Sequence, residues 1–261
     1  IIGVVRSPSE TIHLLEKIDF EYMGEYTIPG HFGFRKRKGV KVNLHVYEPD
    51  HPEIELNLLF RDYLRAHSEA REAYAKLKLH LVSLPCASEK QNSLFKGYTL
   101  GKDEFICSIL KQATFQKLRM RICAHHAEWT AAQHFRQKYF FDKVPISDPY
   151  TWTFDHPQHD HLIFYQGVDI IGYAHVQFWP DKRAALRIIV IDENQRRKGL
   201  GKQFLKYIEK WLKQKNYTSL HTESSPDAFA FYKAQGYVNM TFNDPDGYKS
   251  DPKDTPLGKV L

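Results

Sequence analysis

One segment constrains the fold more than any other: an apolar run, a turn with two glycines and an amphipathic stretch follow one another over residues 184–213. The run Ala184–Ile191 is interrupted only by Arg187, as is typical of a strand buried on both faces. After the turn, apolar side chains recur with helical spacing at Phe204, Leu205, Ile208, Trp211 and Leu212. The sequence therefore predicts a buried strand that leads through a glycine turn into a helix.

The turn combines backbone amides with positive charge. The first amides of a helix have no carbonyl partners, and the helix dipole adds partial positive charge there. Gly199 and Gly201 lack a Cβ, so an anion can approach the backbone closely. Four cationic side chains surround the turn: Arg196, Arg197, Lys198 and Lys202. The pattern predicts a site for a phosphate-bearing ligand, with a solvated basic turn as the alternative.

Composition narrows the class of protein. The 261 residues are enough for two domains, and the 42% that are hydrophobic exclude wholesale disorder. No apolar stretch has the length of a membrane span, and a formal charge of +6 is too small to indicate nucleic-acid binding. Three cysteines without a close pair favour a cytoplasmic protein over a disulfide framework or a zinc ribbon: Cys86, Cys107 and Cys123.

The order of predicted elements indicates an α/β (α+β) chain with two domains, residues 1–111 and residues 112–261. In the first domain, short strands precede helices over Glu69–Val82 and Asp103–Leu110. In the second, a mixed sheet is flanked by helices. We expect a long helix over Phe115–Phe141, a helix from Ser225-Pro226 to Gly236, and strands at Tyr150–Phe154, His161–Gln166, Ile170–Trp179 and Tyr217–Glu223.

Two motifs of the second domain resemble one family. Arg196-x-x-Gly199-x-Gly201 after a strand is similar to the signature with which GNAT N-acetyltransferases bind the pyrophosphate of acetyl-CoA. Ala228-x-x-Phe231-Tyr232-x-x-x-Gly236-Tyr237 is similar to the family's closing helix. The resemblance implies acetyl transfer from acetyl-CoA to a primary amine by direct attack in a ternary complex. It also implies that the strands Ala184–Ile191 and Tyr217–Glu223 diverge in a V.

The resemblance also implies roles for individual residues. Tyr232 would protonate the leaving sulfur, and Glu223 would be the general base, with His175, His221 or a chain of waters as alternatives. Ser225 stands where many family members have Asn, so its role departs from the pattern. The expected acetyl-CoA site comprises Ile189, Val190, Ile191, Arg196, Arg197, Lys198, Gly199, Leu200, Gly201, Lys202 and Ser225.

A histidine-rich stretch precedes the second predicted strand of this domain. His156, His159 and His161 have the spacing His-x-x-His-x-His, which is compatible with a metal site. Pro157 and the position before a strand favour solvated loop histidines instead, so we predict no metal. We expect the acceptor amine to be a small molecule or a peptide, and we expect neither a membrane nor a nucleic acid as partner. The oligomeric state stays open.

The first domain resembles the GrpB-like branch of the nucleotidyltransferase superfamily. The resemblance rests on Leu59–His67, on Asn43-Leu44-His45-Val46, and on Tyr98-x-x-x-Lys102-x-x-Phe105-Ile106. Two-metal phosphoryl transfer needs carboxylates, and Ile1–Val5, where the superfamily's acidic strand would end, has none. We therefore expect an incomplete, catalytically silent domain. Nucleotidyl transfer, or a second domain that holds CoA without chemistry, are the alternatives.

Overall fold

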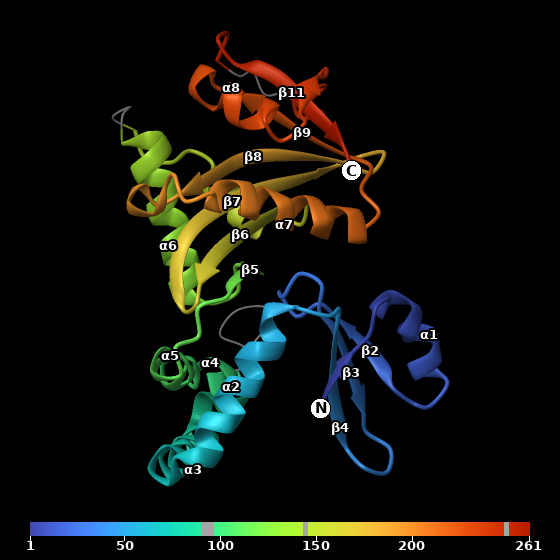
Figure 1. Cartoon of the computed structure of the whole chain (residues 1–261), viewed down its shortest axis with the longest axis vertical. Helices are drawn as coiled ribbons and strands as arrows, with labels where there is room; N and C mark the ends of the chain where they lie inside the picture. Colours follow the sequence, from blue (N-terminus) through green and yellow to red (C-terminus); the bar gives the residue numbers. More distant parts are fainter. Residues whose placement is uncertain (90–96, 143–145, 248–250) are drawn as a thin grey trace. The chain divides into compact units, whose positions relative to one another are not determined.

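The chain divides into two compact units (Figure 1). The computed structural model describes residues 1–89, 97–142, 146–247 and 251–261. The first unit comprises Ile1–Trp129 with Tyr165–Ile170, and the second comprises Thr130–Phe164 with Ile171–Leu261. Both units mix helices with sheets, as predicted for an α/β chain, and the first extends past the predicted boundary near residue 112.

The first unit contains a four-stranded sheet with the order β1-β4-β3-β2, in which only β1 and β4 pair in parallel. The strands are β1 (Ile2–Val4), β2 (Glu21–Gly24), β3 (Phe32–Lys36) and β4 (Val42–Tyr47). The two predicted helices are confirmed as α3 and α5. The helices described in this unit are α1 (Thr11–Glu16), α2 (Pro52–Ala66), α3 (Ser68–Ser83), α4 (Gly97–Leu100) and α5 (Asp103–Gln112).

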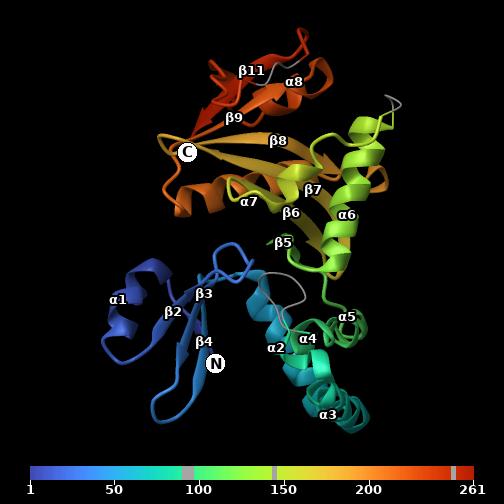
Figure 2. The same ribbon diagram turned by 180° about the vertical axis from the view of Figure 1, so that it is seen from behind.

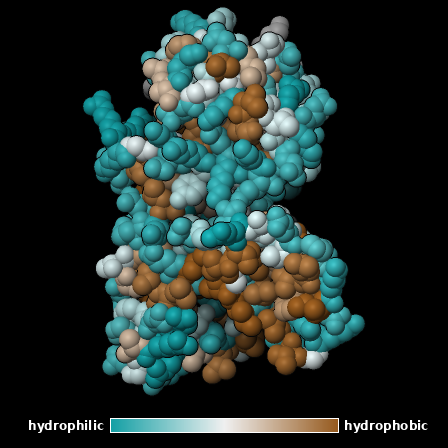
Figure 3. Space-filling model, turned by 45° about the vertical axis from the view of Figure 1, so that its right-hand side comes forward, coloured by the Kyte–Doolittle hydropathy of each residue, from teal (hydrophilic) through white to brown (hydrophobic). Residues whose placement is uncertain are grey.

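Packing covers only part of the apolar surface of the first unit. Its core includes Phe34, Val46, Tyr47, Ile109 and Leu110. Other large apolar side chains are exposed, and Figure 3 shows apolar residues gathered on one face of this unit. Within the described ranges, no helix combines the length and the apolarity that crossing a membrane requires.

The predicted helix over Phe115–Phe141 is wrong in its first part. β5 (Leu118–Ile122) is a strand in which apolar and arginine side chains alternate. Arg119 is buried in this strand, where its Nη1 lies 3.3 Å from Glu53 Oε1, and both side chains are 6% exposed. α6 (His126–Arg136) forms the later part of the predicted helix.

The second unit is built on strands in the order β10-β11-β9-β8-β7-β6. The strands predicted in the second half of the chain are confirmed here, except the first. α7 (Leu200–Gln214) buries the predicted apolar stripe, and α8 (Pro226–Lys233) follows Ser225 as expected. The strands are β6 (His159–Gln166), β7 (Asp169–Trp179), β8 (Arg183–Ile191), β9 (Ser219–Ser224), β10 (Val238–Asn239) and β11 (Thr255–Val260).

The predicted strand over Tyr150–Phe154 is wrong, because a 3-10 helix occupies Thr151–Asp155. Thr153 donates from its backbone N and its Oγ1 to Tyr150 O, at 3.1 and 2.7 Å. These local hydrogen bonds satisfy the groups that a strand would pair with a neighbour. Trp152 and Phe154, whose alternation suggested a strand, belong to this helix instead.

The parallel strands β8 and β9 diverge, as the family resemblance implied (Figure 2). They pair only where Arg183, Ala184 and Ala185 lie opposite Ser219, Leu220 and His221. Beyond that point β8 continues to Ile191, while the rest of β9 pairs with β11 on its other side. A gap in the hydrogen bonding of the sheet therefore opens beside the second half of β8.

Candidate active site

The turn before α7 contains two residues with left-handed backbone conformation. Gly199 has φ +75° and is the residue immediately before the helix, and Arg197 has φ +63°. A Cβ at Gly199 would meet no atom within 4 Å, so open space surrounds this glycine. The backbone conformation, rather than crowding, is what favours glycine here.

The first amides of α7 remain available. Gln203 N donates to Gly199 O at 3.1 Å, which is the first bond of the helical pattern. The amides of Leu200, Gly201 and Lys202 precede it, and the residue at the N-cap position, Gly199, has no side chain with which to cap them. These amides and the helix dipole together favour a bound anion at this position.

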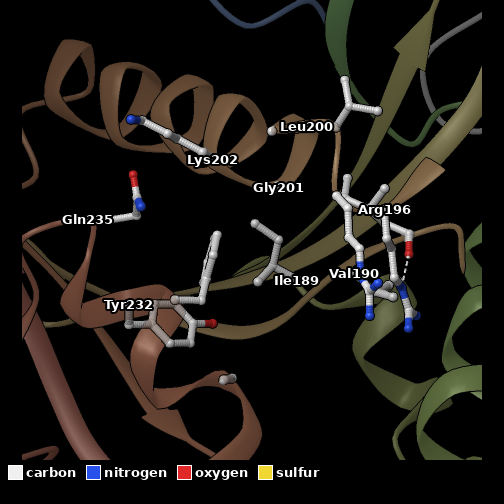
Figure 4. Close-up of a pocket in the computed structure, with 13 residues that line it drawn as sticks. Ile189, Val190, Arg196, Leu200, Gly201, Lys202, Tyr232 and Gln235 are labelled. Carbon is white, nitrogen blue, oxygen red and sulfur yellow. Dashed lines mark hydrogen bonds between the residues drawn. The ribbon is translucent and has the colours of Figure 1, made fainter.

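A cavity of about 420 Å³ lies beside this helix start. Figure 4 shows α7 on one side of it, and Tyr232 on the other side with its hydroxyl toward β8. The predicted residues Lys198 and Ser225 do not line it: Lys198 Nζ donates to Gln195 Oε1 at 2.8 Å, and Ser225 directly precedes α8. The lining is Ile189, Val190, Ile191, Arg196, Arg197, Gly199, Leu200, Gly201, Lys202, Ala228, Phe231, Tyr232 and Gln235.

Backbone groups of β8 face the gap beside this cavity. Asp192 N donates to Ile171 O of β7 at 2.9 Å. Backbone directions alternate along a strand, so the amides and carbonyls of Ile189 and Ile191 point the opposite way, into the gap. Arg196 Nε donates to the Ile191 carbonyl at 2.9 Å, which ties the basic turn to the strand. An extended ligand could pair with the remaining groups as a strand would.

Tyr232 reaches the cavity from α8. It is 5% exposed, and burial raises the pKa of its phenol to about 12, while a hydrogen bond between the phenol and the Thr222 side chain opposes the shift. The phenol therefore stays protonated at neutral pH. Ala228 also lines the cavity from α8, one helical turn before Tyr232, and Phe231 and Gln235 complete this side of the lining. Sequence reasoning did not include these three in the site, although helical spacing from Tyr232 would have identified Ala228.

A second cavity, of about 500 Å³, adjoins the same strand. Leu186, Arg187 and Ile188 line it, directly before the three residues of β8 that line the first cavity. Many of its other lining side chains are aromatic or titratable. The remaining lining residues are Arg136, Phe140, Phe141, Tyr150, Trp152, Thr153, His159, His175, Gln177, Glu223, Phe242, Asp251 and Asp254.

Glu223 lines this second cavity from the end of β9. Partial burial raises the pKa of its carboxyl; Arg187 opposes the shift, while Asp254 and Asp244 add to it. A carboxylate with a raised pKa is a stronger base, as proton abstraction from an ammonium requires. Tyr232 and Glu223 therefore line two different cavities, which adjoin consecutive residues of β8.

The other histidines considered as bases are placed differently. His221 lines neither cavity, and its Nε2 lies 2.9 Å from Ser219 Oγ. His175 lines the second cavity, but both of its ring nitrogens have hydrogen-bond partners, and burial holds its pKa well below the usual value.

The histidines of the His-x-x-His-x-His stretch are not solvated as predicted. His159 is 8% exposed and His161 is 1% exposed, because both belong to β6 rather than to a loop. Among the residues described by the structure, no cluster of three or more His, Cys, Asp or Glu side chains is arranged to hold a metal ion.

Two family models match the chain in separate segments. Residues 1–112 match the GrpB protein family, and residues 125–237 match the acetyltransferase (GNAT) family. Residues 125–237 are a GNAT acetyltransferase domain. Both family resemblances are thereby confirmed, and the GNAT match supports acyl transfer as the reaction class of this domain. The link of the first segment to nucleotidyl transfer stays a prediction.

Two curated relatives are UPF0157 proteins. YqkA of Bacillus subtilis (strain 168) is 42% identical over 84 residues, which cover 32% of this chain and 23% of that protein. BH1888 of Halalkalibacterium halodurans is 31% identical over 117 residues, 43% of this chain and 56% of that protein. The chain therefore spans less than two thirds of the length of either relative.

Solved acetyltransferases are similar to just over half of the chain. An acetyltransferase of Streptococcus agalactiae is 16% identical with a TM-score of 0.46, covering 56% of this chain and 100% of that chain. The PaiA N-acetyltransferase of Thermoplasma acidophilum, in complex with coenzyme A, is 16% identical with a TM-score of 0.42. It covers 56% of this chain and 99% of that chain.

Proposed function

We propose that the GNAT domain transfers an acetyl group from acetyl-CoA to a primary amine, by direct attack in a ternary complex. The observation that carries the proposal is the uncapped start of α7, with left-handed Gly199, at a cavity beside the gap between β8 and β9. Free amides, a dipole and cationic side chains suit a diphosphate. The unpaired backbone of β8 suits the amide-containing arm of the same carrier.

The residues divide the binding task between them. The amides of Leu200, Gly201 and Lys202 bind the diphosphate, and Arg197, which lines the same cavity, adds positive charge. The pantetheine arm lies along β8 and leads the thioester toward the second cavity, which holds the acceptor amine. This arrangement suits a reaction in which both substrates are bound at once.

The chemistry follows from the two titratable groups. Glu223 removes a proton from the acceptor ammonium, and the neutral nitrogen forms a bond to the thioester carbon. The carbon–sulfur bond then breaks, and Tyr232 donates a hydrogen bond to the departing thiolate. The nitrogen loses two protons overall: one leaves through Glu223 to solvent, and the other is balanced by the proton that the thiol gains.

The cradle is tested by replacing Gly199 with a larger, charged residue. Gly199→Glu places a carboxylate where the diphosphate binds and strains a left-handed position, so we expect CoA affinity to fall about 100-fold or more. Calorimetric titration of CoA into the full chain measures this. An acceptor panel, followed by thiol release from acetyl-CoA, tests the reaction itself.

Gly39→Glu is the matched control. Gly39 also has a left-handed φ, of +67°, a Cβ added there would meet no atom within 4 Å, and the residue belongs to the first unit. The same strain and charge are thereby added outside the GNAT domain. Gly199→Asn, which tolerates left-handed backbone, should retain most of the affinity. Unchanged CoA affinity in Gly199→Glu would contradict the proposed cradle.

A further inference from the structure

We infer that His159 donates a hydrogen bond to the substrate amine and thereby selects it. The preferred amine also carries a neutral oxygen that can accept this bond, such as an amide carbonyl or a hydroxyl. The inference deepens the proposed function and rests on it, because it assigns the second cavity to the acceptor. Three observations carry it: a fixed tautomer chain, a buried ring nitrogen without a partner, and the sign of the surrounding charge.

The tautomer chain starts at Arg136, whose guanidinium has only donors. Its Nη1 lies 3.3 Å from His175 Nδ1, so that nitrogen must hold a lone pair. The proton of neutral His175 is then on Nε2, which lies 2.8 Å from His159 Nδ1. His159 Nδ1 accepts in turn, so the proton of neutral His159 is on Nε2. Contacts on one side of the ring thus make the other side an N–H donor.

A second branch from Arg136 ends within the protein. Arg136 Nη1 also donates to Tyr173 Oη at 3.3 Å, and this hydroxyl lies 2.6 Å from His161 Nδ1. His161 Nε2 donates to Thr153 O at 3.2 Å. Every proton on this branch has an acceptor, which makes the open end of the other branch distinctive.

The donor of His159 has no acceptor in the part of the chain that the structure describes. The residue is 8% exposed, its Nε2 is buried without a hydrogen-bond partner, and it lines the second cavity. The rings of Trp152 and His156 lie edge-to-face with it, with centroids 5.3 and 5.0 Å away, and ring faces are weak acceptors. A buried donor left unpaired costs stability, which a ligand oxygen would recover.

Charge around the cavity decides which oxygen fits. Arg136 pairs with Asp148, and Arg187 Nη2 lies 2.5 Å from Asp244 Oδ2, so both cations are neutralised by neighbours. Three acids also line the cavity, Glu223, Asp251 and Asp254, and among the described residues none of them has an ion pair. Burial lowers the pKa of His159 to about 4, so its ring adds no charge. The cavity therefore favours an ammonium and disfavours a ligand carboxylate.

Three phenyl amines test the inference, because aromatic side chains such as Trp152 and Tyr150 line the cavity. They are phenylalanine amide, 2-phenylethylamine and phenylalanine. In the full chain, we expect phenylalanine amide to exceed both others in kcat/KM for thiol release by about tenfold. His159→Phe should abolish the preference over 2-phenylethylamine, His159→Gln should keep it by supplying an N–H, and His156→Phe should leave it unchanged.

The outcomes separate the two proposals. Activity with an unchanged preference in His159→Phe would overturn the inference and leave the proposed function intact. Absence of thiol release by the unaltered protein with the whole amine panel would overturn the proposed function. The inference is then judged by calorimetric binding of phenylalanine amide to the CoA-loaded protein, with and without His159→Phe, and equal affinities would overturn it. Nitrogen-15 NMR provides a direct check, since a His159 ring protonated on Nδ1 at neutral pH would also overturn it.

Discussion

Burial shifts the pKa of two residues in the same direction, with different consequences. It raises the pKa of the Tyr232 phenol to about 12 and also raises that of the Glu223 carboxyl. The phenol becomes a donor that is always protonated, and a poorer acid than a thiol of pKa about 8.5. The carboxylate becomes a stronger base. Burial of each group thus favours its role in the proposed transfer.

For Tyr232→Phe we expect thiol release to fall about tenfold or more, because the leaving sulfur loses its donor. CoA affinity should change little, since the ring still lines the cavity. Steady-state kinetics and calorimetric titration measure the two effects. Tyr237→Phe is the control, because Tyr237 is also buried but lines neither cavity. A rate like that of the unaltered protein would remove Tyr232 from the mechanism.

The ionisation of Glu223 should determine how the rate falls on the acid side of the pH–rate profile. Its carboxyl is protonated at a higher pH than an ordinary Glu because it is partly buried, with Arg187 opposing and Asp254 and Asp244 supporting the shift in pKa. The rate should therefore fall as pH decreases through this raised pKa. Glu223→Gln should lower the rate and remove that limb, as kcat measured across pH would reveal. An acid limb retained in Glu223→Gln would assign it to another group.

Since the folded state raises the pKa of Glu223, it holds the proton more tightly than the unfolded chain, and ionisation costs stability as pH rises. Glu223→Gln should consequently raise the melting temperature at neutral pH relative to the unaltered protein, with a smaller difference near about pH 4. Thermal unfolding at both pH values measures this. A larger gain at the lower pH would contradict the sign of the shift.

At the scale of elements, local sequence patterns predict the structure correctly where one periodicity dominates. The apolar run of β8, the helical stripe of α7 and Gly236 after α8 all predict structures that are present. β5 was missed because Leu118–Ile122 was absorbed into a longer helical pattern, although its side chains alternate strictly. The 3-10 helix at Thr151–Asp155 depends on side-chain bonds that a strand pattern does not encode.

In the candidate site, too, only the parts formed by contiguous sequence motifs could be predicted. The turn and Tyr232 belong to contiguous motifs, whereas the donor state of His159 depends on Arg136 in α6 and His175 in β7, which are 39 residues apart. No periodicity places those groups in contact or assigns a ring proton. The side chains of the second cavity come from several separate segments, which sequence spacing could not bring together.

At the scale of the whole molecule, the segment matched to GrpB does not form a compact unit alone. The first unit includes β5, whose Arg119 forms a buried pair with Glu53 of α2. Arg119 also stacks over Tyr165, with 4.2 Å between its guanidinium and the ring centroid. The packing therefore carries this unit past the end of the family match at residue 112.

Breaking that pair should destabilise the full chain. Arg119→Met leaves the Glu53 carboxylate buried beside fewer cations, which we expect to cost about 3–5 kcal/mol of unfolding free energy. The double variant Glu53→Met/Arg119→Met should recover much of this loss. Asp62→Ala, which removes an exposed pair with Arg61, is the control and should change stability by less than about 0.5 kcal/mol. Urea unfolding measures the stability of all three variants. An Arg119→Met variant with unchanged unfolding free energy would refute the role of the pair.

The divergence of β8 from β9 has a consequence for self-association. An open strand edge is normally a template on which another chain can polymerise. Here the open stretch is short and faces a cavity bordered by α7 and α8, so a second polypeptide would find little room to align along it. A slender ligand would still fit, and the fold thus offers unsatisfied backbone to a small molecule while limiting the risk of aggregation.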